Sequence, residues 1–227
     1  MSIGDDEAIT VTDTNITVAE FNDINDLTSG VVTATIENQT LSNLGSLEET
    51  GNALTVVVSD TGSTVSASAL NALDAKTTIE VNATAATGFT GTYSDLDALE
   101  TARDANTIEI GADEAVAVTD TNITVAEFND INDLTSGVVT ATIENQTLSN
   151  LGSLEETGNA LTVVVSDTGS TVSASALNAL DAKTTVAVDA TAAAGFSGAL
   201  SDLVTLSGAI GSTCLLYTSD AADEGLG

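Results

Sequence analysis

Oxygen-bearing side chains cluster at a few places along the chain, and calcium is the cation that such clusters suit best. The densest cluster is Asn22-Asp23-Ile24-Asn25-Asp26, and it recurs at Asn129–Asp133. Two further clusters are Asp113-Glu114 and Thr119-Asp120-Thr121-Asn122. None has the spacing of an EF-hand loop or of the Gly-Gly-x-Gly-x-Asp nonapeptide. Calcium is therefore one candidate ligand, and a diffuse atmosphere of cations is the alternative.

Catalytic chemistry has few candidates in this chain. It contains no histidine, which excludes a Ser-His-Asp triad, a histidine base and a histidine metal site. The paired acids Asp5-Asp6-Glu7 and Asp113-Glu114 could hydrolyse glycosides only from a cleft with two carboxyls about 5 to 10 Å apart, and aromatic sugar platforms are scarce at 3% of residues. Lys76 and Lys183 precede predicted strands, so we interpret them as structural charges at helix ends. We predict no catalytic, cofactor-binding or metal-binding residue, and a protein that is not an enzyme.

Short helices are predicted where apolar residues recur at intervals of three. The pattern repeats in steps of 23 residues over 15–37, 38–60 and 61–83, followed by a longer unit over 84–121. Such a stripe lies along one side of a short helix, and its residues are Val18, Phe21, Ile24 and Leu27, then Leu41, Leu44 and Leu47, then Leu70 and Leu73, then Tyr93, Leu96 and Leu99. Thr17-Val18-Ala19-Glu20 fits a capping box, and Ser94-Asp95-Leu96-Asp97 resembles one.

Strands are predicted after each helix, because β-branched residues are concentrated there. The predicted strands are Val31–Ile36, Leu54–Val58, Thr77–Val81 and Thr107–Ile110. A helix between successive strands is typical of a right-handed parallel crossover. The predicted fold is therefore α/β, a right-handed solenoid of short helix-strand repeats with a parallel sheet and leucine-rich-repeat-like geometry.

The residues expected to face inward are Val32, Ala34 and Ile36 in one strand and Ile79 and Val81 in another. These two sets differ by one residue from a strict 23-residue register, which would exchange the faces of the strand. An adjusted turn would absorb this slip. The alternative architecture is a tandem array of β-sandwich modules.

The domain organisation follows from a long internal repeat. Residues 11–78 recur without change as residues 118–185, a period of 107 residues. We assign residues 4–110 to the first repeat and residues 111–213 to the second, which continues directly from the first. Tandem repeats of this length are typical of solenoids and of long surface proteins, which act by extending from a surface and presenting binding faces more than by a single chemical site.

Charge narrows the class of partner. The chain has 34 acidic and three basic residues and a formal net charge of −31. Such a chain offers no basic patch, so we expect no nucleic-acid partner and no association with an anionic membrane surface. No apolar run approaches the roughly 18 residues of a membrane helix, so we expect no membrane insertion. The expected partners are cations and neutral surfaces.

The two ends of the chain differ from the repeats. Met1–Asp6 lacks the basic start and apolar stretch of a secretory signal. Residues 214–224 resemble a translation of the adapter DNA used in sequencing libraries, and they contain the sole cysteine, Cys214. We interpret residues 214–227 as a non-native tail and the chain as a fragment of a longer gene product.

Several sequence segments of the repeat resemble segments of a known class of proteins. They are Ile16–Glu20, Ser29–Ile36, Leu73–Thr78 and Gly91–Leu96, and they are similar to repeats in giant acidic cell-surface proteins of marine picocyanobacteria and related marine bacteria. The resemblance covers residues 4–210 and carries no catalytic signature. It implies an extracellular, structural or adhesive segment of a large secreted surface protein that contacts matrix components and neighbouring repeats. The alternatives are a calcium-dependent adhesin built of β-sandwich modules and a polysaccharide-acting enzyme on a repeat scaffold.

Overall fold

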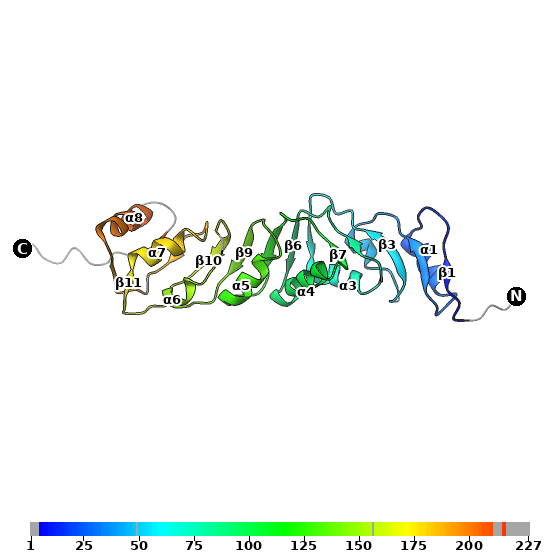
Figure 1. Cartoon of the computed structure of the whole chain (residues 1–227), viewed down its shortest axis with the longest axis horizontal. Helices are drawn as coiled ribbons and strands as arrows, with labels where there is room; N and C mark the ends of the chain where they lie inside the picture. Colours follow the sequence, from blue (N-terminus) through cyan, green and yellow to red (C-terminus); the bar gives the residue numbers. More distant parts are fainter. Residues whose placement is uncertain (1–4, 49, 156, 211–214, 217–227) are drawn as a thin grey trace, which may run out of the picture. The chain divides into compact units, whose positions relative to one another are not determined.

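The computed structural model describes residues 5–48, 50–155, 157–210 and 215–216 (Figure 1). They form two compact units. Unit 1 comprises the chain up to Thr119 together with Leu134–Gly137, and unit 2 comprises Asp120–Asp133 and the chain from Val138 onward. We describe each unit by itself.

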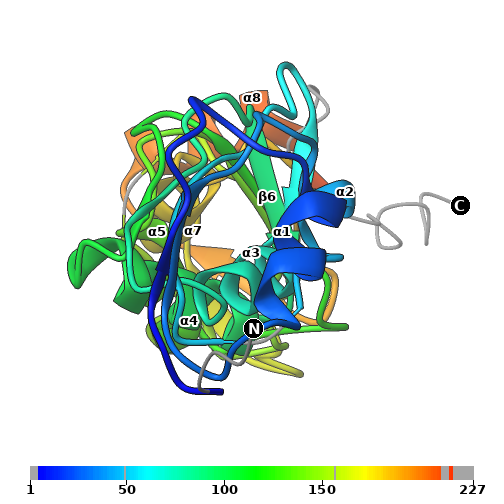
Figure 2. The same cartoon turned by 90° about the vertical axis from the view of Figure 1, so that its right-hand side faces the viewer.

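Eight helices are present among the described residues. Unit 1 contains α1 (Val18–Asn25), α2 (Leu41–Leu44), α3 (Ala67–Asp74) and α4 (Tyr93–Asp104). Unit 2 contains their counterparts α5 (Val125–Asn132), α6 (Leu148–Leu151), α7 (Ala174–Asp181) and α8 (Leu200–Ile210). Within unit 1, α3 and α4 lie side by side (Figures 1 and 2), and the side-chain amide of Asn71 donates to the carbonyl of Asp95 at 2.9 Å.

The strands of unit 1 form two parallel sets. One sheet has the order β1 (Ile9–Thr10), β2 (Val32–Thr35), β3 (Ala53–Val57), β5 (Val81–Asn82), β7 (Ile108–Glu109). In the other set, β6 (Gly88–Gly91) pairs with both β4 (Thr64–Ser66) and β8 (Ala115–Val118). In unit 2, β9 (Val139–Thr142) pairs with β10 (Ala160–Thr162), β11 (Thr171–Ser173) with β13 (Gly195–Ser197), and β12 (Val188–Asp189) with β14 (Leu215–Leu216). We call the stretch of chain that leads from one strand to its parallel neighbour a coil.

The prediction of an α/β fold with parallel sheets is confirmed. Every strand pair within the two units is parallel. The alternative of tandem β-sandwich modules is wrong for the described residues, because such modules are antiparallel and contain little helix. The set β4, β6 and β8 was not predicted, because β4 is only three residues long, glycines begin and end β6, and alanines interrupt the valines of β8. Of the predicted tail 214–227, only Leu215 and Leu216 are described.

The predicted leucine stripe forms the helical part of the core of unit 1. Phe21, Leu44, Leu70, Leu96 and Leu99 have no exposed surface. Leu41, Leu47 and Leu73 are buried as well, and Tyr93 is half-buried. Leu27 departs from the prediction, because 60% of its surface is exposed.

Helix α1 begins with the predicted capping box. The Thr17 hydroxyl accepts from the amide of Glu20 at 3.2 Å, and the Glu20 carboxylate accepts from the Thr17 amide at 2.9 Å. The hydrogen bond from the Thr17 backbone, followed by that from its hydroxyl, holds the pKa of Glu20 below its usual value. The box predicted at Ser94–Asp97 is wrong by two positions, since Thr92 and Asp95 form it.

The predicted slip of register is absorbed by coils of unequal length. Thr33 pairs with Ala53, whereas Val56 pairs with Val81. Val32, Ala34 and Ile36 point inward as predicted, as does Val81. Ile79 does not, because 42% of its surface is exposed. Ile79 precedes β5, and the chain just before it is held by Thr77, whose hydroxyl donates to the Leu54 carbonyl at 2.8 Å and accepts from the Leu54 amide at 3.0 Å.

The buried leucines generate a first prediction. The double variant Leu44→Asp with Leu151→Asp places a charge without a partner in the core of each copy, since both leucines have no exposed surface. It should lower the free energy of unfolding by several kcal/mol, measured by denaturant unfolding. Ser42→Asp with Ser149→Asp adds the same charges to exposed positions of the same two helices and should unfold like the parent protein. Equal unfolding curves for the two double variants would show that the stripe is not core.

Candidate functional site

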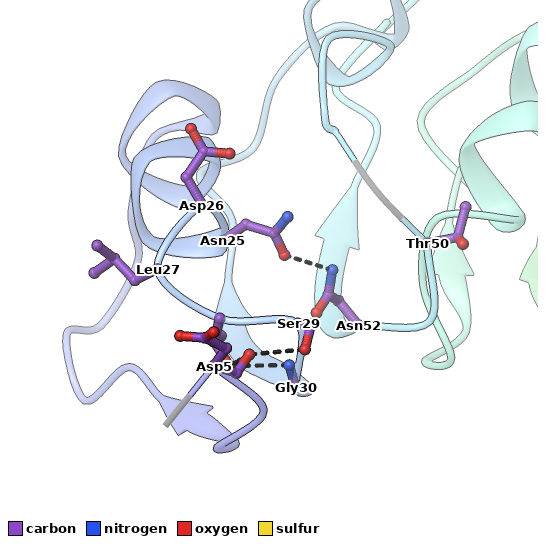
Figure 3. Close-up of a pocket in the computed structure, with 9 residues that line it drawn as sticks. Asp5, Asn25, Asp26, Leu27, Ser29, Gly30, Thr50 and Asn52 are labelled. Atoms are coloured by element: carbon purple, nitrogen blue, oxygen red, sulfur yellow. Dashed lines mark hydrogen bonds between the residues drawn. The ribbon is translucent and has the colours of Figure 1, made fainter. Parts of the chain in front are cut away.

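The candidate site is a pocket of about 420 Å³ in unit 1 (Figure 3). It lies beside the end of α1 and the segment that leads into β2. Its lining residues are mostly polar: Asp5, Asn25, Asp26, Leu27, Thr28, Ser29, Gly30, Thr50 and Asn52. Two residues of the predicted calcium cluster, Asn25 and Asp26, are thus part of the pocket wall.

The floor of the pocket is held by a pair of buried asparagines. The side-chain amide of Asn52 donates to the side-chain oxygen of Asn25 at 3.0 Å (Figure 3). The side-chain oxygen of Asn52 accepts from the backbone amide of Val32 at 2.8 Å. Burial makes each of these bonds costly to lose, because a buried amide without a partner is strongly disfavoured. The same chain of contacts recurs in unit 2, where Asn159 binds Asn132 at 2.9 Å and Val139 at 2.8 Å.

The rim of the pocket is held by hydrogen bonds to the segment 5–7. The Asp5 carbonyl accepts from the amide of Ser29 at 2.6 Å and from its hydroxyl at 2.7 Å. The hydroxyl of Thr28 donates to the Glu7 carbonyl at 2.5 Å. A side chain at position 30 would not fit here, since a Cβ atom on Gly30 would lie 2.6 Å from the Asp6 carbonyl oxygen.

Hydrogen bonds within the fold occupy the amide groups of the predicted calcium cluster. Asn22 donates to the Ser46 carbonyl at 2.9 Å and accepts from the Glu48 amide at 3.1 Å. Asn129 makes the equivalent contacts with Ser153 and Glu155. Asp23 and Asp26 are exposed. In the described part of the chain, no three acidic or thiol side chains are grouped so as to hold a metal ion.

The remaining acidic candidates do not form a shared cleft. Asp5, Asp6 and Glu7 are exposed, as is Asp113. Glu114 is buried with 7% of its surface exposed, and its Oε2 has no hydrogen-bond partner among the described residues. Sequence reasoning paired Asp113 with Glu114 and missed this difference, which arises because β8 begins at Ala115 and side chains alternate along the strand direction. Of the last cluster, Thr119 belongs to unit 1 and Asp120–Asn122 to unit 2.

Two of the three basic residues, Lys76 and Arg103, make hydrogen bonds to backbone carbonyls of the fold. The Lys76 ammonium donates to the Leu47 carbonyl at 2.5 Å, close to the C-terminal end of α2. The predicted role as a structural helix-end charge therefore holds for Lys76, although the helix is a neighbouring one. Lys183 occupies the equivalent position after α7 and is half-buried. Arg103, which sequence reasoning did not single out, donates to the Leu134 carbonyl at 2.7 Å and pairs with Glu100 and Asp104.

Comparison with known proteins gives no relative. No protein-family model, no curated protein and no solved structure matches the chain. The helices of the described residues include none with both the length and the apolar character needed to cross a bilayer.

The asparagine pair generates a second prediction. Asn52→Ala with Asn159→Ala leaves the amides of Val32 and Val139 without their buried acceptors. Each copy should lose about 1 to 3 kcal/mol of stability, measured by thermal unfolding. The matched control is Asn43→Ala with Asn150→Ala, which removes exposed asparagines from the same two copies and should change stability by less than half as much. An equal effect in both pairs would contradict a special role for the buried amides.

A pair of equivalent aspartates generates a third prediction. Asp74 accepts from the Thr107 hydroxyl at 2.9 Å, whereas Oδ1 of Asp181 is buried with no partner among the described residues. Burial raises the pKa of Asp181. The protonated form therefore favours the folded state, and this contribution is lost as pH rises through the raised pKa.

Asp181→Asn should consequently raise the melting temperature at pH 7 and leave it nearly unchanged at pH 3. Asp74→Asn is the control and should give no increase at either pH, because Asp74 already has a hydrogen-bond donor. Melting curves at the two pH values measure the difference. A lower melting temperature for Asp181→Asn at pH 7 would show that the ionised carboxylate has a stabilising partner.

Proposed function

We propose that the chain is a non-catalytic, structural or adhesive segment of a large secreted cell-surface protein, built as a right-handed α/β solenoid. The solenoid is supported by the hydrogen bonds that join each coil to the next. Backbone pairing and side-chain hydrogen bonds join residues 20 to 27 positions apart along much of each unit. A fold held together by contacts between neighbouring coils can lengthen by adding coils.

One observation carries the proposal: the same leucine is exposed in the first copy and buried in the second. Leu27 is 60% exposed, whereas Leu134 is 2% exposed. In unit 1, the coil that contains α4 comes before Leu134, and Arg103 of that helix donates to the Leu134 carbonyl. Leu27, in the first copy, is the equivalent residue. Its exposed surface fits a further coil of the α4 type, which is how a long tandem array would use it.

A structural role agrees with the charge and with the chemistry of the chain. A net charge of −31 keeps a long extracellular polymer soluble and apart from anionic surfaces. The resemblance to giant acidic surface proteins of marine bacteria points to the same role. The proposed partners are neighbouring repeats, cell-surface or matrix components, and cations, with no nucleic acid and no membrane insertion.

Two other functions receive less support. A calcium-dependent adhesin would use the clusters around Asn22 and Asn129, whose amides already bind backbone groups. A polysaccharide-acting enzyme would need two carboxyls facing a common cleft. The pocket wall includes Asp5 and Asp26, which are both exposed and lie beside no aromatic side chain among the lining residues.

The proposal is tested by adding a coil. A copy of residues 79–110 is fused in front of Gly4, which occupies the same repeat position as Gly111. The added coil should cover Leu27, slow hydrogen exchange of residues 24–30 at least tenfold, and raise the melting temperature. The matched control carries aspartate at the added positions that correspond to Leu96 and Leu99, which are fully buried in α4. Unchanged exchange of residues 24–30 with the unmodified extension would contradict the stacking of coils.

A further inference from the structure

A backbone carbonyl in the wall of the pocket has no hydrogen-bond donor among the described residues. It belongs to Leu27, which lines the pocket just after the end of α1. Leu134 is the equivalent residue of the second copy, and its carbonyl accepts from Nη1 of Arg103 at 2.7 Å. Arg103 and Leu134 both belong to unit 1. The same carbonyl is therefore seen once with a guanidinium donor and once without it.

The groups around the Leu27 carbonyl favour a cation. Asp5 and Asp26 line the same pocket (Figure 3), and both are exposed. The pocket also lies at the C-terminal end of α1, where the helix dipole favours positive charge. Among the described residues that line the pocket, none is basic. A cationic ligand would therefore bring the positive charge that the pocket wall does not supply.

A guanidinium group suits these acceptors better than an ammonium group or a metal ion does. Carbonyl and carboxylate oxygens only accept hydrogen bonds, and arginine offers five donors in a planar fork. A guanidinium is also more weakly hydrated than an ammonium, so it loses less solvation on entering the pocket. In the part of the chain that the structure describes, no three acidic or thiol side chains are placed to hold a metal ion.

The chain itself indicates which partner carries the guanidinium. Arg103 lies in the last turn of α4, and the coil that contains α4 precedes Leu134 along the chain. The residue of α8 equivalent to Arg103 is Ile210, so a coil of the α8 type has no guanidinium to offer. The partner that fits the pocket is therefore a coil of the α4 type.

We propose that the pocket beside α1 is a binding site for a guanidinium group, supplied by an arginine at the Arg103 position of a preceding coil. The inference rests on the proposed function, because it names the side chain by which a stacked coil engages the first copy. Bound as Arg103 is bound to Leu134, the guanidinium donates to the Leu27 carbonyl in a pocket that also holds the carboxylates of Asp5 and Asp26.

The test is titration of the full chain with N-acetyl-L-arginine amide at constant ionic strength, followed by the amide signals in NMR spectra. The amide nitrogen of Thr28 is bonded to the Leu27 carbonyl carbon, so its signal reports on that carbonyl. It should shift in a saturable manner, and N-acetyl-L-lysine amide should bind at least fivefold more weakly. Thr135 is the internal control, because the Leu134 carbonyl already has a donor, and its signal should stay in place.

The deciding variant is Asp5→Asn with Asp26→Asn, which removes both carboxylates from the pocket and keeps the carbonyl. It should bind arginine amide at least fivefold more weakly than the parent chain. Asp6→Asn with Asp23→Asn makes the same change of charge at exposed positions outside the lining and should bind like the parent. Circular dichroism verifies that both variants are folded. Equal binding of arginine amide and lysine amide, or no saturable shift of Thr28, would overturn the proposal.

The result is separable from that of the coil-addition experiment. If the added coil protects residues 24–30 and arginine amide does not bind, the guanidinium site is wrong and the stacking of coils stands. If arginine amide binds and the added coil gives no protection, the guanidinium site is supported and the stacking of coils is contradicted.

Discussion

Parallel pairing between successive coils is the constraint on which the rest of each unit depends. Isolated strands of two to five residues, such as β1 and β3, have no stability of their own in water. Each becomes stable because the next coil supplies partners for its amides and carbonyls. Where the backbone cannot pair, a side chain substitutes for it, as Asn52 does for Val32 and Thr77 does for Leu54. The asparagines and threonines that look like ordinary surface residues in the sequence therefore complete the hydrogen bonding of the coil edges.

This constraint explains why the sequence predicted the class of fold better than its details. Helix periodicity and β-branched runs depend on a few neighbouring residues, so the leucine stripe at Leu41, Leu44 and Leu47 and the strand at Val32–Thr35 could be predicted locally. Whether a residue faces inward depends also on its partner one coil away. Ile79 was assigned to the core for its alternation with Val81, yet β5 begins only at Val81 and Ile79 is exposed. Before this strand, the chain is held to the previous coil by Thr77, whose hydroxyl binds both the amide and the carbonyl of Leu54.

The candidate site was harder to predict than the fold, for a related reason. Sequence reasoning counted the oxygen atoms around Asn22 and Asn25 as available ligands. In the structure, partners 24 to 27 residues away occupy them. Spacing along the chain does not reveal such distant partners. The exposure of Leu27 and the burial of Glu114 likewise depend on which coil lies next to them, and no local pattern distinguishes Leu27 from Leu134, whose flanking residues are identical.

The exact duplication of residues 11–78 as 118–185 has a consequence for how the molecule assembles. Coil edges that lie inside the duplicated span meet the same residues as their twins, as the pairs Thr35–Thr55 and Thr142–Thr162 show. A partially folded chain therefore offers each of these edges two equally good partners. A second molecule of the same chain offers these edges the same two partners. The chemistry that lets coils stack within a chain therefore also permits exchange of coils between chains, and folding at high concentration competes with domain-swapped assembly. The strong negative charge opposes the close approach of two such chains and so favours correct pairing within one molecule.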